Sequence, residues 1–333
     1  MKKISCGLWY ANEAEEAANL YLSLFRRGKI GSIARYTKTG AEMANRPEGS
    51  VLTVEFELEN QRIVALNGGP LFPFTPAFSF LVHCESAAEL DRLWKGLSET
   101  GSVKMPLDTY PWANRYGWTA DRFGLNWQLL FDEKKKTKQK IVPAMLLTGH
   151  RFGKGDEALQ FYRSLFPGSK ILAMNREETT DTIRSCTFTL FDEHLALMEG
   201  DAKPGYDFNE SFSLIVSCDS QNEIDRYWDE LVREGTPSEC GWLRDKYGAA
   251  WQIVPKDLGK WVADPKRGEN VMQALRGMTK LDYDRLENAY LFPRGRPNAD
   301  RELSESSSTP ASPGRPGGRR EPYRRPSSPS SSG

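Results

Sequence analysis

The chain contains one sequence pattern twice, and this duplication limits the folds open to it more than any other feature. Residues 117–130 read GWTADRFGLNWQLL and residues 241–254 read GWLRDKYGAAWQIV, with six of fourteen positions identical. The match continues upstream, with FLVHCESAAELDRLW at 80–94 against LIVSCDSQNEIDRYW at 214–228, and EAANLYLSLF at 16–25 against EALQFYRSLF at 157–166. Because internal repeats mark tandem structural units, the sequence predicts two similar domains.

Within each copy, strand and helix patterns follow a fixed order. Residues 51–58 (VLTVEFEL) alternate apolar and polar side chains as a half-buried strand does. The Ser86 to Glu89 spacing is a capping box and predicts the start of a helix. Strand, helix and three strands occur twice in each copy, so the sequence predicts an α+β fold of four βαβββ modules. A further helix is expected over Met272–Tyr290.

These modules, the LNGGP turn at 66–70 and the GW..DRFG..WQ ending resemble the glyoxalase/bleomycin-resistance/extradiol dioxygenase (vicinal oxygen chelate) superfamily. Within it they resemble the PhnB-like group, which carries the label 3-demethylubiquinone-9 3-methyltransferase domain. The resemblance covers residues 3 to about 255. It implies tandem glyoxalase-like domains, in each of which two modules form one curved eight-stranded mixed sheet with helices outside.

The repeat and the composition together predict the domain boundaries. We expect a first domain at 1–133, a basic linker at 134–140, a second domain at 141–256, a partly helical extension at 257–291 and a tail at 292–333. The tail is rich in Arg, Ser and Pro and almost without large apolar residues, so it is expected to be disordered.

Charge and cysteine content narrow the functional classes. The net charge is zero, which does not favour nucleic acid as a partner, except through a weak contact of the Arg-rich tail; a merely solubilising tail is the alternative. Five cysteines without a CxxC pair fit a reducing compartment. No apolar run is long enough to span a bilayer, so the sequence predicts a soluble, cytoplasmic protein without a membrane partner.

The superfamily resemblance implies where a metal would bind. Its enzymes hold one divalent ion on side chains of the first, fourth, fifth and eighth strands of the sheet. Matching strand to strand gives these eight positions: Cys6, Ala65, Ser79 and Gln128 in the first copy, and Ala144, Leu197, Ser213 and Gln252 in the second. Divalent ions require imidazole, carboxylate or thiolate ligands, so we expect no metal and no cofactor, and the catalytic residues stay unknown.

The preferred interpretation is a protein that binds an unknown small molecule in the concave pocket of a curved sheet. The candidate ligand-binding residues are Asn67, Ser79, His83, Tyr110, Trp112, Trp118, Gln128, Glu199, Ser213, Trp242 and Gln252. The two glutamines could donate and accept hydrogen bonds at once. Asn67 could equally form the turn before two glycines, and Glu199 could equally be an exposed edge carboxylate. The aromatic insertion at 105–118, expected as a loop, either covers a pocket or packs on the other domain.

Two other functions remain open at this point. One is a metal-dependent lyase, isomerase or dioxygenase whose metal site the strand matching has missed. The other is methyl transfer to a quinone precursor, as the family label implies, although no segment has the glycine-rich turn of a nucleotide-binding βα unit. The two copies are expected to pair within the chain, and further self-association is left open.

Overall fold

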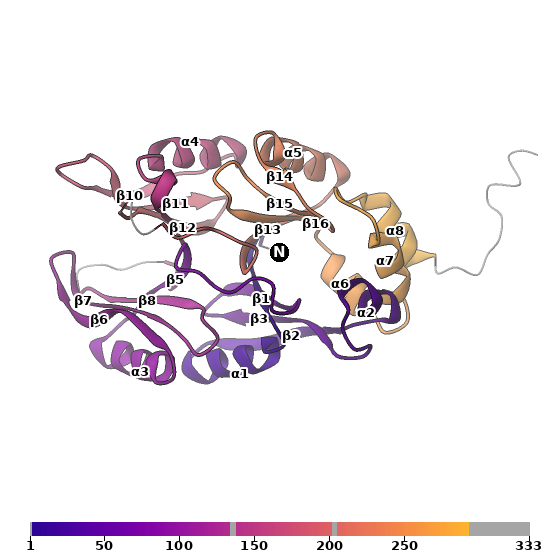
Figure 1. Ribbon diagram of the computed structural model, residues 1–333, viewed down its shortest axis with the longest axis horizontal. Coiled ribbons are helices and arrows are strands. Elements are labelled where there is room, and N and C mark those ends of the chain that lie inside the picture. The colour runs from indigo at the N-terminus through magenta and orange to yellow at the C-terminus, as the bar shows by residue number, and fades with distance from the viewer. Residues whose placement is uncertain (1, 134–137, 202–204, 293–333) are drawn as a thin grey trace, which may run out of the picture. The chain divides into compact units, whose positions relative to one another are not determined.

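The computed structural model describes residues 2–133, 138–201 and 205–292, which belong to one compact unit. Two curved sheets fill its middle, and four long helices lie in two layers outside them (Figure 1). Part of the expected linker, 134–137, and the expected tail from residue 293 onward lie outside the described residues.

The four predicted βαβββ modules are all present. The first comprises β1 (Ile4–Tyr10), α1 (Ala14–Leu24), β2 (Gly28–Arg35), β3 (Val51–Leu58) and β4 (Gln61–Asn67), with an additional helix α2 (Lys38–Ala44). The second comprises β5 (Phe78–His83), α3 (Ala87–Ser98), β6 (Ser102–Tyr110), β7 (Ala113–Ala120) and β8 (Asn126–Phe131).

The second copy supplies the other two modules. The third comprises β9 (Ile141–Leu147), a 3-10 turn at Gly149–Arg151, α4 (Gly155–Leu165), β10 (Ile171–Arg176), β11 (Ile183–Leu190) and β12 (Glu193–Glu199). The fourth comprises β13 (Phe212–Cys218), α5 (Gln221–Val232), β14 (Thr236–Pro237), β15 (Trp242–Arg244) and β16 (Ala250–Pro255). As predicted, Ser86 Oγ accepts a hydrogen bond from Glu89 N and caps α3.

The strands form two eight-stranded mixed sheets, as expected, but each sheet takes one module from each copy. Sheet A has the order β14-β15-β16-β13-β1-β4-β3-β2 and joins the fourth module to the first. Sheet B has the order β10-β11-β12-β9-β5-β8-β7-β6 and joins the third module to the second. The antiparallel pairs β1–β13 and β5–β9 make these two junctions. The sequence interpretation had both modules of one copy in the same sheet.

The two modules of each copy stay side by side through their helices. Arg92 of α3 donates a hydrogen bond to the carbonyl of Leu24 in α1, and Arg226 of α5 donates one to Leu165 O in α4. Helices α1 and α3 therefore form one outer layer, and α4 and α5 form the other (Figure 1). Each sheet runs from one layer to the other, so its concave inner face lies between the two copies.

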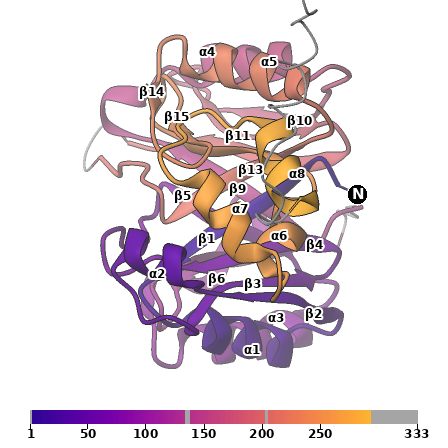
Figure 2. The same ribbon diagram turned by 90° about the vertical axis from the view of Figure 1, so that its right-hand side faces the viewer.

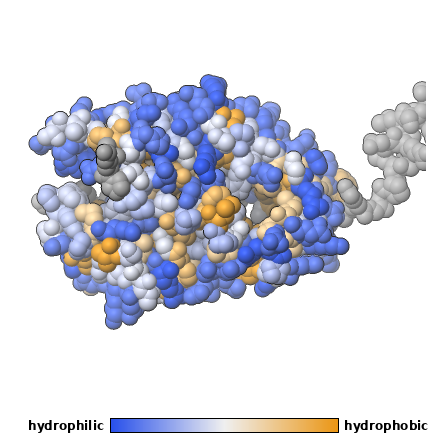
Figure 3. Space-filling model, in the orientation of Figure 1, coloured by the Kyte–Doolittle hydropathy of each residue, from blue (hydrophilic) through white to orange (hydrophobic). Residues whose placement is uncertain are grey.

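The main core lies between the outer faces of the sheets and these helices. Its largest fully buried side chains include Trp127, Trp251, Tyr21 and Tyr162. Tyr21 of α1 packs edge-on to Trp127 of β8, at a ring distance of 5.0 Å. The upper and lower edges of the space-filling view are mainly hydrophilic, and most hydrophobic side chains in view lie between them (Figure 3). In the part of the chain that the structure describes, no helix combines the length and apolar character needed to cross a membrane.

Two sequence predictions of local structure are wrong. The aromatic insertion is not a loop, because most of it forms the long hairpin of β6 and β7. Met272–Tyr290 is not one helix: the extension contains α6 (Leu258–Ala263), α7 (Gly268–Leu275) and α8 (Tyr283–Leu291). Gly277 adopts a positive φ of 77° after α7, and Asp282 caps α8 by accepting from Arg285 N. A left-handed glycine and a new N-cap end one helix and begin another.

Candidate functional site

The inner faces of the two sheets carry corresponding side chains, and we name them cup A and cup B. Cup A is defined by Gly7, Trp9, Val64, Ser213, Trp242 and Gln252; cup B is defined by Ala144, Leu146, Ala196, Ser79, Trp118 and Gln128. The strand registers fix this correspondence: Gly7 pairs with Ser213 across sheet A as Ala144 pairs with Ser79 across sheet B. Neighbouring side chains on a strand point to opposite faces, so these residues face away from the helices.

Cup B has a continuous row of buried hydrogen bonds along its floor. Tyr116 OH donates to Gln128 Oε1 at 2.7 Å, and Gln128 Nε2 donates to Ser79 Oγ at 2.8 Å. All three side chains are buried. Burial raises the pKa of Tyr116, and its hydroxyl therefore stays a proton donor at neutral pH. Beside this row, Trp118 Nε1 donates to Asn126 Oδ1 at 3.1 Å.

The hairpin of β6 and β7 connects this row to an aromatic cluster. The rings of Tyr110 and Trp112 stack at 5.0 Å, and Tyr110 meets Tyr116 edge-on at 5.6 Å. Trp112 is 44% exposed. His83, at the end of β5, is half-buried and pairs in register with Leu130 of β8. The structure thus brings Ser79, Trp118 and Gln128 together, and it links Tyr110 and Trp112 to them only through Tyr116.

Cup A has the same Gln–Ser hydrogen bond as cup B, but bulkier side chains at its wall. Gln252 Nε2 donates to Ser213 Oγ at 2.9 Å, as Gln128 does to Ser79. Trp242 lies edge-on to Trp9 at a ring distance of 5.8 Å. Leu146 holds the position of Trp9 in cup B, so the two cups differ most at this wall.

Asn67 and Glu199, predicted to contact a ligand, have structural roles. Asn67 Oδ1 accepts from Ala14 N, the first residue of α1, and its Nδ2 donates to Val51 O. Glu199 Oε1 accepts from Gly155 N, the first residue of α4, and its Oε2 accepts from Ile183 N. Each side chain ties a strand end to the start of a helix, because the first N–H groups of a helix lack partners within it.

Of the eight positions that the resemblance implies for metal ligands, five lie on the inner faces and three on the helix side. Ser79, Gln128, Ala144, Ser213 and Gln252 do lie on the inner faces. Cys6, Ala65 and Leu197 instead belong to the main core on the helix side. The inner-face residues next to them are Gly7, Val64 and Ala196, as the strand registers show.

The corrected positions do not fit the metal that the glyoxalase-like fold implies. Serine, glutamine, glycine, alanine and valine offer at most weak neutral oxygen ligands, whereas Zn²⁺ and similar ions bind imidazole, carboxylate and thiolate. Within residues 2–133, 138–201 and 205–292, no three His, Cys, Asp or Glu side chains are grouped so that they could hold an ion.

Sequence reasoning missed a buried carboxylate in each copy. Asp121 Oδ2 accepts from Tyr21 OH at 2.7 Å and from Trp127 Nε1 at 2.8 Å, and its Oδ1 accepts from two backbone N–H groups of the following turn. Asp245 makes the same four bonds, with Tyr162 and Trp251 as its side-chain partners. Both lie on the helix side of the sheets, beneath the cups.

Burial raises the pKa of Asp121 and of Asp245, although their hydrogen bonds act in the opposite direction. These carboxylates join a helix of one module to the last strand of the next, so their role is to support the cups. The signal was available in the sequence, because the Asp and the Trp six residues later recur in both copies together with the helix tyrosine.

The family described as 3-demethylubiquinone-9 3-methyltransferase matches residues 2–130 and 139–254. The chain belongs to this family. A Bacillus cereus protein proposed to be such a methyltransferase and named PhnB protein is 37% identical to it, over 39% of this chain and 100% of its own, with a TM-score of 0.36.

Two further structures are similar to this PhnB-like chain. A Staphylococcus aureus protein is 30% identical over 39% of this chain and 97% of its own, with a TM-score of 0.17. Glyoxalase I from Zea mays is 11% identical over 76% of this chain and 93% of its own, with a TM-score of 0.48. No curated protein matches the chain.

The extension after residue 254 lies outside both stretches that match the PhnB-like family, and it contacts elements next to sheet A. On one rim, Thr39 Oγ1 of α2 donates to Glu269 of α7 at 2.6 Å. On the other, Cys240 N donates to Met278 O at 2.8 Å, and Lys280 pairs with Asp225 of α5 at 3.0 Å. Figure 2 shows α6, α7 and α8 between the two helix layers on this side of the molecule.

Proposed function

We propose that this PhnB-like protein binds a small organic molecule in cup B without a catalytic metal. The observation that carries the proposal is the buried row Tyr116–Gln128–Ser79. A glutamine amide has two donor hydrogens and two acceptor lone pairs. Among the described residues Gln128 uses one of each, so one donor and one acceptor remain for a ligand on the inner face.

The residues on the inner face support binding rather than metal chemistry. An amide and a hydroxyl at the positions where related enzymes carry metal ligands can orient a polar group of a ligand. The surrounding positions are apolar: Val142, Ala144 and Ala196 form a small buried cluster, with Leu81 and Met198 packed against it. Apolar walls with a few placed polar groups are typical of small-molecule sites.

Two differences between the cups favour cup B. Leu146 stands where cup A has Trp9, whose indole packs on both Trp242 and Phe72. Part of the extension lies near the same wall: Val262 of α6 and Leu66 of β4, which pairs in register with Trp9, both pack against the small buried cluster of Tyr36, Ala41 and Leu52. Cup A is therefore narrowed by side chains and by an additional segment of the same chain.

Methyl transfer is the second candidate because the family description names it. It requires a site for a methyl donor, and calorimetric titration with S-adenosylmethionine tests this directly. We expect no saturable heat, since the turn before α1 is not rich in glycine and the glycine-rich segment before α4 is followed by a strand, β10, without an acid. Saturable binding would favour methyl transfer over small-molecule binding alone as the function of this protein.

We also propose that the two copies act as an intramolecular pair. Both sheets contain strands of both copies, so separating the copies would break the β1–β13 and β5–β9 pairs. The prediction is that the chain is monomeric in sedimentation equilibrium. A stable dimer at micromolar concentration would contradict it.

Native mass spectrometry of the freshly purified full-length chain tests the binding proposal, with Gln128→Leu and the matched Gln252→Leu as variants. We expect a retained organic mass in the wild type and in Gln252→Leu, loss of that mass in Gln128→Leu, and no stoichiometric metal. Circular dichroism and urea unfolding check that both variants fold. Wild-type protein that retains no small molecule under any mild condition, or one that carries a stoichiometric ion, would overturn the proposal.

A further inference from the structure

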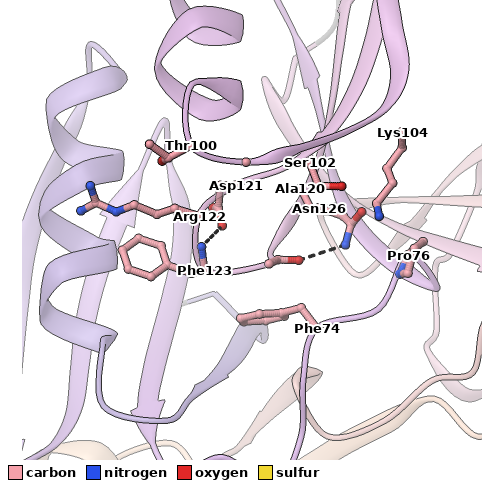
Figure 4. Close-up of a pocket in the computed structure, with 12 residues that line it drawn as sticks. Phe74, Pro76, Thr100, Ser102, Lys104, Ala120, Asp121, Arg122, Phe123 and Asn126 are labelled. Atoms are coloured by element: carbon pink, nitrogen blue, oxygen red, sulfur yellow. Dashed lines mark hydrogen bonds between the residues drawn. The ribbon is translucent and has the colours of Figure 1, made fainter.

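A cavity of about 500 Å³ opens at one end of cup B. It is lined by the first residues of β6 and β8, by the turn that joins β7 to β8 and by the connector before β5 (Figure 4). Asn126 and Ala120 pair in register, and Asn126 stands two residues before Gln128 on the same strand. Strand alternation therefore puts Asn126 and Ala120 on the same inner face as Gln128, and the cavity lies where this face meets the turn that joins β7 to β8. Its volume is in the range that small-molecule sites occupy.

In the second copy of the repeat, larger side chains occupy the region that corresponds to this cavity. Ala120 and Pro76 line the cavity. The residues that match them in the second copy are Arg244 and Glu210, whose side chains form a bidentate ion pair with N–O distances of 2.8 and 2.6 Å. The first copy thus has the small side chains of Ala120 and Pro76 where the second copy has an ion pair.

Arg151 also occupies the corresponding region of the second copy. Its guanidinium donates to Tyr247 O, pairs with Asp207 at 2.7 Å and lies over the ring of Phe208 at 5.5 Å. The residue that matches Phe208 in the first copy is Phe74, which lines the cavity in Figure 4. No arginine is inserted there, because the first copy lacks the GHRFGKG segment at 149–155.

The polar groups of the cavity favour a negative charge. Lys104 lines it and, within the described part of the chain, has no ion pair; Figure 4 shows its ammonium turned toward the side that carries Asn126. Arg122 also lines it and pairs with Glu16 at 2.6 Å. The one carboxylate in the lining, Asp121, directs its oxygens to Tyr21, Trp127 and the turn.

Apolar surface accompanies this charge. Phe74 and Pro76 line one side of the cavity, and the hydroxyls of Thr100 and Ser102 line the other (Figure 4). An ammonium holds a carboxylate by a charge-assisted hydrogen bond, and an aromatic ring offers a flat apolar contact.

We propose that the ligand of cup B is a small organic anion, whose carboxylate binds at Lys104 and Asn126 and whose apolar body lies on Phe74 and Pro76. This inference rests on the proposed function and names the chemical class of its ligand. It also fits the lack, in the first copy, of counterparts to Arg151 and Arg244.

The test uses benzoate and its neutral isostere benzamide as probes for the full-length protein, with saturation-transfer NMR to measure both dissociation constants. We expect benzoate to bind about tenfold more tightly than benzamide. Lys104→Gln should remove this preference. The double variant Ala120→Arg/Pro76→Glu, which copies the ion pair of the second copy, should abolish binding of both probes. Lys95→Gln, which removes an exposed lysine of α3, is the matched charge control and should change neither.

Equal binding of the two probes, no binding of benzoate, or an unchanged preference in Lys104→Gln would each overturn the inference. The proposed function fails separately. A co-purified molecule that depends on Gln128 but not on Lys104 would reject the anion and keep the site. Protein that retains no molecule at all would reject the function itself.

Discussion

Cup A and cup B come from one duplicated pattern, yet their inner faces have diverged while their supports have not. Both keep the Gln–Ser pair on the floor and the buried Asp beneath it. Cup A has Trp9 and a C-terminal extension next to it, whereas cup B has the long hairpin with Tyr110, Trp112 and Tyr116. The two copies thus share the side chains that hold the sheets together and differ in the walls of the cups.

The largest effect tests whether the two supports are equivalent. Asp121→Ala and Asp245→Ala each leave a tyrosine hydroxyl, an indole N–H and two backbone N–H groups without their buried acceptor. Each should lower the free energy of unfolding by about 3 kcal/mol or more in urea titrations. The control Asp91→Ala removes only an exposed partner of Arg115 and should cost under about 0.5 kcal/mol. A loss below about 1 kcal/mol in either copy would show that the supports are not equivalent.

The next prediction concerns the floors of the cups. A Cβ added at Gly7 would meet Ser213 Oγ and lie 2.6 Å from Gln252 Nε2. Gly7→Ala should therefore disturb the Gln–Ser pair of cup A and cost about 1–3 kcal/mol by overpacking. Ala144 already carries this methyl group in cup B, so Ala144→Gly should cost about 0.5–1 kcal/mol through backbone entropy. If Gly7→Ala proved neutral in urea unfolding, the floor of cup A would be looser than that of cup B.

A third prediction uses pH to loosen the extension from cup A alone. Glu269 is partly buried, which would raise its pKa, but hydrogen bonds from Thr37, Thr39 and Gln273 outweigh this and lower the pKa from 4.5 to about 2. A folded-state pKa below the unfolded value gives a stabilisation that is complete above pH 4.5 and is lost as the pH falls toward 2.

Wild type should therefore exceed Glu269→Gln in unfolding free energy by about 1 kcal/mol at pH 6, and the gap should close by pH 2 to 3. Urea unfolding at four pH values measures it. A gap that stays constant with pH would mean that Glu269 does not hold the extension as an anion.

The smallest effect is expected at the other anchor of the extension. Lys280 pairs with Asp225 at 3.0 Å and Asp229 at 2.9 Å on an accessible surface of α5. Lys280→Met should cost about 0.5 kcal/mol, and raising the salt concentration should shrink the difference. A loss above about 2 kcal/mol would identify this pair, rather than the apolar contacts of Leu281 and Leu286, as the main attachment.

Much of the fold could be predicted because both copies repeat the same strand and helix patterns. The pairing of modules across the copies could not, because β5 and β13 are equivalent in sequence and offer similar edges to β1 or β9. The inner faces were hard to assign for a related reason. All seven residues of β9 and all seven of β13 are buried, so apolar alternation does not tell one face from the other.

The inner-face position of a side chain was predictable where a polar residue interrupts an apolar strand, as Ser79, Gln128, Ser213 and Gln252 do. The partners of a polar residue at the end of a strand were not predictable, since Asn67 and Glu199 bind backbone distant in sequence. The apolar pattern of Met272–Tyr290 continues through Gly277, so it predicted one helix where the structure has two.

The most direct measurement is a crystal structure of the freshly purified full-length protein at a resolution that separates organic ligands from ions. Density for an organic molecule against Gln128 in cup B, with none against Gln252 in cup A, is the predicted result. An ordered metal ion held by protein atoms in cup B, or a ligand bound in cup A alone, would contradict it.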